Sequence, residues 1–119
     1  MIALLQFRPD PAQSAEQFQS DAEQALRLLA ERPGYLRGSV GRATDDAGSW
    51  LLLTEWESVG AYRRGLGGYQ VKLLATPLLS QALDQPSAFE ELLRIGPDGQ
   101  ETARASDRAD DADWGDRKL

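Results

Sequence analysis

The stretch WLLLTEWE, residues 50–57, is the strongest candidate β-strand in the chain. Its three consecutive leucines place apolar side chains on both faces, a pattern typical of a strand that is covered on both sides. Ser58 follows directly and is a good N-cap residue for a helix. The segment therefore predicts a buried strand that leads straight into a helical region.

Two further strands are predicted before this one. The turn sequence DDAG at residues 45–48 joins it to a weakly alternating strand over residues 35–42. An apolar strand is predicted over residues 2–8, where the turn sequence Pro9-Asp10-Pro11 ends it.

A helix is predicted between those two strands. It begins at Ser14, which forms a capping-box pattern with Gln17, and it ends at Pro33-Gly34. Its apolar residues recur at helical spacing: Phe18, Ala22, Ala25, Leu26 and Leu29.

The second helical region begins at Ser58 and reaches about Leu83 in pieces. Its breakers are Gly65, Gly67-Gly68 and Pro77. The glycine-rich run interrupts a helix rather than linking a strand to one, so a hinge or a close backbone approach explains it better than a phosphate cradle. A turn over residues 84–87 and a fourth strand over residues 89–95 complete the order.

The order β-α-β-β-α-β predicts an α+β ferredoxin-like sandwich, with an antiparallel four-stranded sheet and both helices on one face. Residues 2–5 and 51–53 are apolar at consecutive positions, so the other face of the sheet also needs a cover. A second copy of the same sheet is the economical cover. We therefore expect a homodimer rather than a patchily apolar exposed face.

Composition excludes several classes of function. The 119 residues contain no cysteine and no histidine, which excludes disulfides, Cys/His zinc sites and Ser-His or Cys-His catalysis. The formal charge of −6 argues against nucleic-acid binding. No apolar run is long enough to span a membrane and no signal peptide is recognisable, so we expect a cytoplasmic protein with no membrane partner.

Residues 1–95 are expected to form the folded domain. Residues 96–119 carry 7 acids, 4 bases and few large apolar residues, so they are expected to form an acidic tail that is mobile or docked across the dimer, with Trp114 as its anchor. The tail's aspartates lack the spacing of a calcium loop and predict a solvated acidic segment: Asp107, Asp110, Asp111 and Asp113.

Three segments together resemble the antibiotic biosynthesis monooxygenase family of the dimeric α/β-barrel superfamily. They are Ile2-Ala3-Leu4-Leu5-Gln6-Phe7-Arg8, Arg32-Pro33-Gly34-Tyr35, and Leu53-Thr54-Glu55-Trp56-Glu57-Ser58 followed by Ala61-Tyr62. The last is the most distinctive, because a strand ends on Trp-x-Ser and an aromatic residue lies one turn into the next helix. The resemblance covers roughly residues 1–95 and implies a dimeric α/β barrel.

The resemblance also implies a chemistry without metal, flavin or haem. In such monooxygenases a phenolic or quinol-like substrate is deprotonated and its anion passes an electron to dioxygen inside a dry, aromatic-lined cavity. Tyr62 is the candidate catalytic residue. The candidate substrate-binding residues are Gln6, Phe7, Trp56, Tyr69 and Arg63, with Arg42 as a further polar candidate and Trp50 as a further wall.

Structural roles compete with these assignments. Trp56 is also a natural wedge between strand and helix, Phe7 a natural core residue, and Arg63-Arg64 a solvated helix surface. Haem degradation, found in another branch of the superfamily, is disfavoured. That branch uses an asparagine, a tryptophan and a haem-ligating histidine at positions that fall near Phe7, Gly65 and Ala75, and none of these three residues matches. A non-catalytic small-molecule-binding or accessory barrel, and an oligomerisation domain with a collapsed pocket, remain alternatives to the enzyme.

Overall fold

The computed structural model describes residues 1–106, which fall into two units, Met1–Phe89 and a second unit that begins at Glu90. The first unit contains the α+β sandwich. No helix within residues 1–106 combines the length and the apolar composition that crossing a membrane requires. Trp114 and the four aspartates Asp107, Asp110, Asp111 and Asp113 lie outside the described residues.

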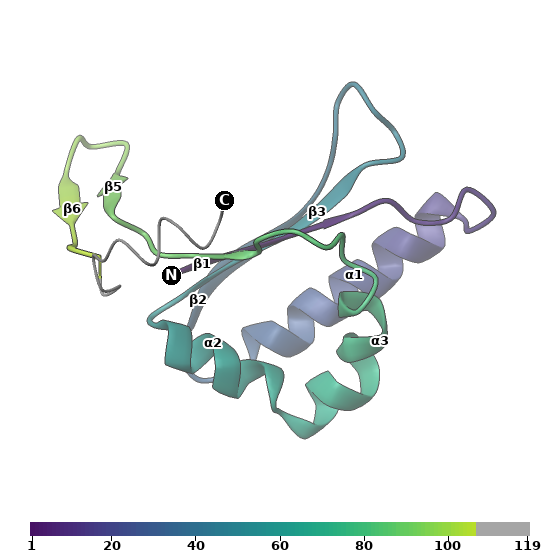
Figure 1. Ribbon diagram of the computed structural model, residues 1–119, viewed down its shortest axis with the longest axis horizontal. Coiled ribbons are helices and arrows are strands. Elements are labelled where there is room, and N and C mark those ends of the chain that lie inside the picture. Colours follow the sequence, from purple (N-terminus) through teal and green to yellow (C-terminus); the bar gives the residue numbers. More distant parts are fainter. Residues whose placement is uncertain (107–119) are drawn as a thin grey trace, which may run out of the picture. The chain divides into compact units, whose positions relative to one another are not determined.

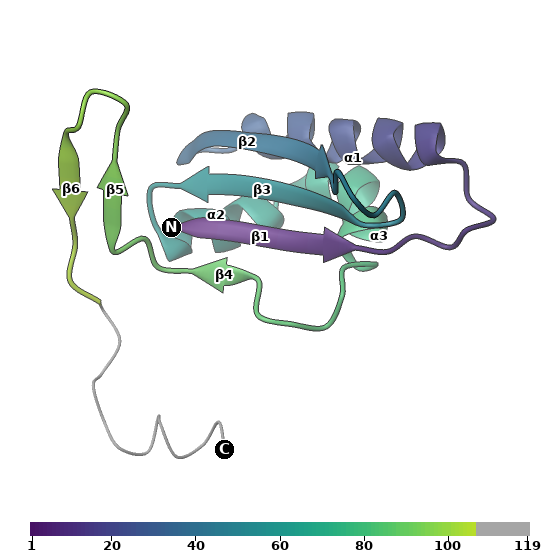
Figure 2. The same cartoon turned by 90° about the horizontal axis from the view of Figure 1, so that it is seen from above.

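The sheet of the first unit has the strand order β2-β3-β1-β4, as Figure 2 shows. Its two central strands are β1 (Ile2–Phe7) and β3 (Trp50–Trp56), which pair antiparallel from Ile2 opposite Glu55 to Phe7 opposite Trp50. Strand β2 (Tyr35–Arg42) pairs antiparallel with the other edge of β3, with a register shift between Tyr35 and Arg37. The ferredoxin-like antiparallel sheet is confirmed.

All helices of this unit cover one face of the sheet (Figure 1). Helix α1 (Ala15–Ala30) follows the expected N-cap, since Ser14 Oγ accepts a hydrogen bond of 3.2 Å from the Gln17 backbone N–H. Only this half of the expected capping box forms, because the Gln17 side chain donates to Asp21 instead. The predicted apolar stripe is confirmed by its buried members: Phe18, Ala22, Ala25 and Leu29.

The second helical region is divided into three pieces, α2 (Val59–Leu66), the π-helical η1 (Val71–Ala75) and α3 (Thr76–Leu79). The Ser58 cap is confirmed, with Ser58 Oγ accepting from the Ala61 N–H at 3.0 Å. The expected division near Pro77 is confirmed, since η1 ends at Ala75 and α3 begins at Thr76. Pro77 itself lies in the first turn of α3, where a proline is well tolerated. The helix ends at Leu79, before the predicted Leu83.

The strand expected over residues 89–95 is divided, which corrects the sequence prediction. Only β4 (Ala88–Phe89) joins the sheet, where it runs antiparallel to β1. Phe89 already pairs with Ile2, the first residue of β1, so a longer β4 would find no partner on that strand. In the second unit, β5 (Leu93–Ile95) forms a hairpin with β6 (Glu101–Ala103), and β6 lies inside the segment expected to be a tail.

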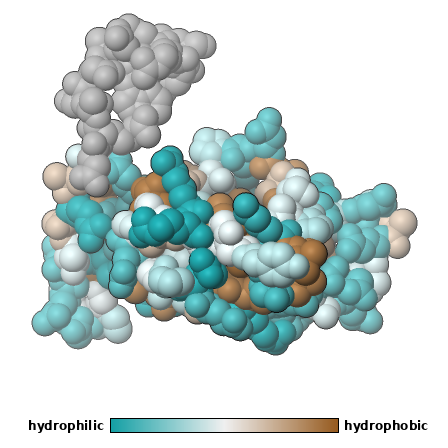
Figure 3. Space-filling view, turned by 90° about the horizontal axis from the view of Figure 1, so that it is seen from below, coloured by the Kyte–Doolittle hydropathy of each residue, from teal (hydrophilic) through white to brown (hydrophobic). Residues whose placement is uncertain are grey.

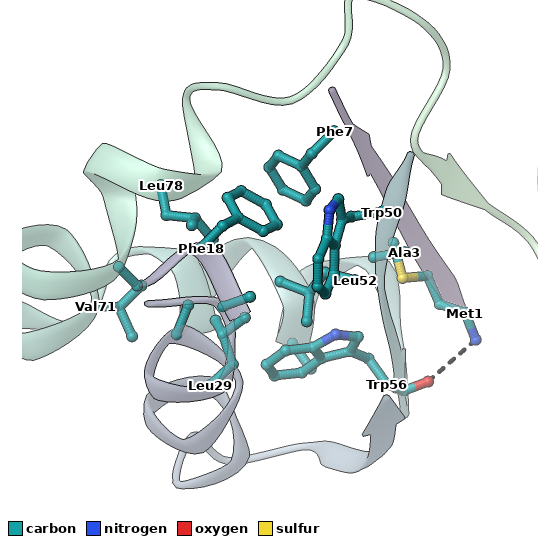
Figure 4. Close-up of a cluster of buried hydrophobic side chains, with 14 residues drawn as sticks. Met1, Ala3, Phe7, Phe18, Leu29, Trp50, Leu52, Trp56, Val71 and Leu78 are labelled. Atoms are coloured by element: carbon teal, nitrogen blue, oxygen red, sulfur yellow. Dashed lines mark hydrogen bonds between the residues drawn. The ribbon is translucent and has the colours of Figure 1, made fainter. Parts of the chain in front are cut away.

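The core lies between the sheet and the helices and is rich in aromatic residues (Figure 4). Phe7, Phe18 and Trp50 form a continuous group, with ring centroids 5.5 Å apart for Phe7–Phe18 and 5.3 Å apart for Phe18–Trp50. Trp56 lies at the other end of β3 and is equally buried. Each such side chain removes a large apolar area from water, so the two tryptophans anchor the two ends of the sandwich.

The opposite face of the sheet is covered by no helix of the first unit (Figure 1). Side chains alternate along a strand, so the residues between the buried ones point to this face. Its apolar members come from three strands: Ile2, Leu4, Leu51, Leu53 and Phe89. Phe89 is 42% exposed and the other four are half-buried. This helix-free face is therefore more apolar than a surface meant for water.

The helical side also carries apolar surface. Figure 3 looks onto this side and shows brown, hydrophobic patches among hydrophilic teal. Leu73 and Leu74 of η1 are among the exposed apolar residues, at 56% and 43%.

Candidate functional site

The residues that the sequence singled out most strongly, Trp56 and Tyr62, lie together. Trp56 ends β3 and Tyr62 lies one turn into α2, and their ring centroids are 5.6 Å apart. Tyr35 contacts the same indole edge-on at 5.5 Å. The indole Nε1 donates a hydrogen bond of 2.8 Å to Thr54 Oγ1, which fixes the ring in the core. The wedge role of Trp56 is thus confirmed, and the Tyr62 ring packs against a rigid neighbour.

The Tyr62 hydroxyl can act as a hydrogen-bond donor. The side chain is half-buried, and burial raises the pKa of its phenol above the ordinary value. The phenol is therefore neutral at neutral pH and keeps its proton. Within residues 1–106 the hydroxyl makes no hydrogen bond to another side chain or to the backbone. A ligand oxygen could accept a hydrogen bond from this hydroxyl.

The glycine-rich run after Tyr62 allows helix α2 to lie close to the core, which confirms the close-approach interpretation. A Cβ on Gly65 would lie 2.8 Å from Trp56 Cη2, closer than real Cβ atoms come to other atoms. A Cβ on Gly68 would lie 2.9 Å from the guanidinium carbon of Arg32. The glycines therefore let the backbone lie close to an indole and to a guanidinium group.

The other predicted site residues are distributed over the molecule. Phe7 is a core residue beside Phe18, at the opposite end of β3 from Trp56. Gln6 points to the helix-free face, where its side-chain oxygen accepts a hydrogen bond from Gln85. Arg63 is exposed on α2, and Tyr69 is 75% exposed. The described residues thus bring Tyr62 and Trp56 together but do not join the remaining four to them.

Tyr69 lies at the edge of a hollow of about 230 Å³ between the end of α1 and the start of η1. Arg32 also lines this hollow, and its Nε is a buried donor that has no hydrogen-bond partner. The remaining lining residues are Leu28, Glu31, Gly68, Gln70 and Val71.

A larger hollow, of about 350 Å³, lies at the other end of the sandwich. The loop between β1 and α1 and the hairpin between β2 and β3 form its walls, and these two segments lie at the same end of the sheet in Figures 1 and 2. Phe18 and Trp50 line its base. Arg42 crosses the Trp50 ring, with its guanidinium carbon 4.6 Å from the ring centroid.

Sequence reasoning named Arg42 and Trp50 as candidates but did not find this hollow. Its loop residues, Pro9, Asp10 and Pro11, were assigned only to a turn. No local signal places that loop opposite the hairpin, because their approach depends on the pairing of β1 with β3. The hollow is therefore a product of the tertiary fold.

The two arginines near the hairpin, Arg8 and Arg42, differ in whether they pair with a carboxylate. Arg8 forms an ion pair with Asp46, whose carboxylate also accepts from the Gly48 N–H at 3.1 Å. The Gly48 hydrogen bond first, and then the Arg8 side chain, hold the pKa of Asp46 below its usual value. Arg42, by contrast, has no carboxylate partner within residues 1–106. In the same range, no three side chains of the types that bind metals are grouped to hold an ion.

The sequence matches the model of a known protein family. The family model for antibiotic biosynthesis monooxygenase matches residues 1–68, which include Trp56 and Tyr62. No curated protein matches the chain.

Several solved structures resemble the fold. SnoaB, a cofactor-independent oxygenase from Streptomyces nogalater, is 21% identical, with a TM-score of 0.61 over 76% of this chain and 94% of that chain. A conserved protein from Methanosarcina mazei Go1 is 17% identical, with a TM-score of 0.59 over 73% and 84%. Rv0793 from Mycobacterium tuberculosis is 15% identical, with a TM-score of 0.57 over 93% and 96%. At these identities the likeness establishes the shared fold.

Proposed function

The chain belongs to the antibiotic biosynthesis monooxygenase family, and on this basis we propose that it is a cofactor-independent monooxygenase acting on a phenolic or quinol-like aromatic compound. The fold it shares with the oxygenase SnoaB is compatible with this proposal. One fold can host many activities, so the activity must come from the residues of the site.

The observation that carries the proposal is the neutral Tyr62 hydroxyl beside Trp56. Burial raises its pKa, and within residues 1–106 the hydroxyl has no competing hydrogen-bond partner. A phenolate substrate needs such a donor, because its anion must be stabilised where water is excluded. Tyr62 can donate to the phenolate oxygen, while the indole of Trp56 supports the tyrosine ring.

The proposed reaction leaves the redox chemistry to the substrate. The phenolate transfers one electron to dioxygen, and the resulting radical and superoxide combine at a ring carbon. One oxygen atom then becomes a ring carbonyl, and the other leaves as water with two hydrogens from the substrate. The protein stabilises the anion, excludes water and holds the ring in position.

Oxygen uptake with anthrone- and quinol-type substrates tests the proposal. The informative pair of variants is Tyr62→Phe and Tyr35→Phe, because both tyrosines contact the indole of Trp56 and only Tyr62 is assigned a role. Tyr62→Phe should lower turnover about 10- to 1000-fold, the scale of a lost oxyanion donor. Tyr35→Phe should retain most of the activity.

The runner-up function is a small-molecule-binding or accessory protein without catalysis. It would be favoured if the wild-type chain bound these substrates and consumed oxygen no faster than buffer. Equal turnover in wild type and Tyr62→Phe would support the proposal that the chain is an enzyme and would show that Tyr62 has no role in its mechanism.

We further propose that two copies associate through the helix-free face. Leu51 and Leu53 of β3 continue across the sheet to Leu4 and Ile2 of β1, and Phe89 extends the strip at the edge. A second copy of the same face is self-complementary, as a two-fold dimer requires. Each protomer would keep its own Tyr62, which lies on the helical side of the sheet.

A further inference from the structure

The hollow between the β1–α1 loop and the β2–β3 hairpin has the features of a ligand site that is separate from Tyr62. Its volume of about 350 Å³ lies at the lower end of the range for small-molecule pockets, roughly 300–1,000 Å³. It therefore suits a ligand of one to three rings. Trp50 in its base is the first residue of β3, whereas Trp56 is the last, so the two sites lie at opposite ends of one strand.

Arg42 is held in place at this hollow. Its Nε donates a hydrogen bond of 2.7 Å to the Ala47 carbonyl, and its guanidinium lies over the Trp50 ring. Planar guanidinium groups stack on aromatic faces and keep their remaining donors in a fixed plane. The side chain is thus ordered before any ligand arrives, which lowers the entropic cost of binding.

The remaining donors of Arg42 have no acidic partner within residues 1–106. Two other arginines of the first unit are paired, Arg8 with Asp46 and Arg37 with Glu55. Arg42 forms no such ion pair with any acidic residue in the described range 1–106. Its terminal Nη groups therefore remain free to donate to an anion.

The walls of the hollow favour a flat, apolar ligand body. Pro9 and Pro11 line the hollow from the β1–α1 loop, and Arg42, whose guanidinium lies over the Trp50 ring, lines it from the end of β2. The start of α1 lies at the same hollow, through Ser14 and Ala15, and the positive end of its dipole adds to the attraction for an anion.

One group opposes an anion. The Asp10 carboxylate also lines the hollow, where its Oδ1 accepts a hydrogen bond of 2.9 Å from the Ala12 N–H. The chain as a whole is negative, so attraction must come from Arg42 and the helix end at short range. We expect weak to moderate affinity that falls as salt is added.

We propose that this hollow binds a planar aromatic acid, with Arg42 donating to its carboxylate or phenolate oxygen and its rings lying between the guanidinium and the two prolines. The proposal stands on the hollow itself and does not require that the chain be a monooxygenase.

Calorimetry on the full chain tests the site with 2-naphthoate as the probe. The comparison ligands are 2-naphthylmethanol, which keeps the rings without the charge, and cyclohexanecarboxylate, which keeps the charge without the flat rings. Wild type should bind 2-naphthoate at least about tenfold more tightly than either, because both recognition elements are then used.

Three variants make the test specific. Arg42→Gln should weaken 2-naphthoate binding about tenfold or more, whereas Arg64→Gln, an exposed arginine on α2, should leave it unchanged. Asp10→Asn should tighten binding several-fold, because the repulsive charge is lost while the amide oxygen can still accept from Ala12. This gain does not depend on whether Arg42→Gln folds well. Amide shifts on titration should centre on residues 14–18 and 46–50.

The results separate this proposal from the proposed function. Binding that is unaffected by both Arg42→Gln and Asp10→Asn, or shifts centred on Tyr62, would overturn the site. Binding with these variant effects, but without oxygen uptake on any substrate, would establish the site and contradict the proposed monooxygenase activity. Oxygen uptake that falls in Arg42→Gln and not in Tyr62→Phe would support the site and move the reaction to it.

Discussion

Trp56 and Thr54 form a polar pair inside the core, with the indole Nε1 donating to the threonine Oγ1 at 2.8 Å. Both residues lie on the helix-facing side of β3, two positions apart, and both are almost fully buried. A buried donor and a buried acceptor satisfy each other here, so the indole can adopt one orientation without leaving either group unpaired. Tyr62 packs against that fixed ring.

This pair predicts strong coupling between two substitutions. Trp56→Phe and Thr54→Val each leave one buried polar group unpaired, which costs about 1–3 kcal/mol of unfolding free energy, with a cavity term added for the smaller ring. The double variant removes both groups. Its loss should be smaller than the sum of the single losses by about 0.5–3 kcal/mol, measured by urea denaturation. Simple additivity would show that the hydrogen bond contributes nothing.

Gly65→Ala should destabilise the fold by about 1–3 kcal/mol, because the new methyl group would overlap the buried indole of Trp56. Gly67→Ala is the matched control, since the nearest atom to its Cβ is the Arg64 carbonyl oxygen at 3.4 Å. That change should alter stability by less than about 1 kcal/mol. Thermal denaturation of the two variants checks the difference, and equal losses would contradict the close approach of α2.

The fold could be predicted from sequence where local pattern and tertiary packing agree. The helical spacing of Phe18, Ala22 and Leu29 requires one buried face, and that face packs on the sheet. The end of β4 could not be predicted, because residues 93–95 are as strand-like as Phe89. What stops β4 is its register, in which Phe89 already faces the first residue of β1.

The same distinction between local sequence signals and tertiary packing applies to the residues of the candidate site. Trp56 and Tyr62 could be found because they lie only six positions apart in the chain, at the end of a strand and in the first turn of the next helix. The hollow at Arg42 could not be found, because its walls come from two loops that approach only after β1 and β3 have paired. Arg42 and Trp50 share that hollow through their pairing across β2 and β3.

Leu53→Lys should convert a dimer into a monomer. Leu53 pairs across the sheet with Leu4 and Ser39 at the centre of the helix-free face, so a lysine would bring a buried charge into the contact. Leu73→Lys, an equally drastic change on the helical side, should leave the dimer intact. Sedimentation at micromolar concentration checks both. A wild-type species near 13 kDa would contradict association through this face.

Truncation after Ile95 should leave a folded chain whose melting temperature changes by less than about 4 °C. The first unit, Met1–Phe89, contains the core and the pairing of β4 with β1. Truncation after Asp84 is the contrasting variant, because it removes β4 and the 2.7 Å hydrogen bond from the Leu4 N–H to the Ser87 carbonyl. A fall of many degrees in the first variant would mean that residues 96–119 stabilise the fold, for example by docking across a dimer.

Tyr62 should remain protonated in the folded chain to a higher pH than a free phenol does. Burial raises its pKa, so the folded state holds this proton more tightly than the unfolded state, whose tyrosines titrate near 10. The unfolding free energy that Tyr62 contributes in this way is fully present below the pKa of the unfolded state. It is lost as the pH rises through the pKa of the folded state. Absorbance at 295 nm measures the ionisation. Burial, and secondarily Glu55, also raise the pKa of Tyr35. Tyr62→Phe should therefore remove one of two late steps, and Tyr35→Phe the other.

The same protonation state fixes the expected pH dependence of turnover. The chain has no histidine, and a protonated Tyr62 can donate to a phenolate but cannot act as a base near neutrality. The rate of oxygen uptake should then rise with pH toward the pKa of the substrate's phenol. It should shift in parallel when ring substituents change that acidity. In Tyr62→Phe the rate should be lower at every pH while the profile keeps its midpoint. A midpoint that stays fixed across substrates of different acidity would instead assign the titration to a protein group.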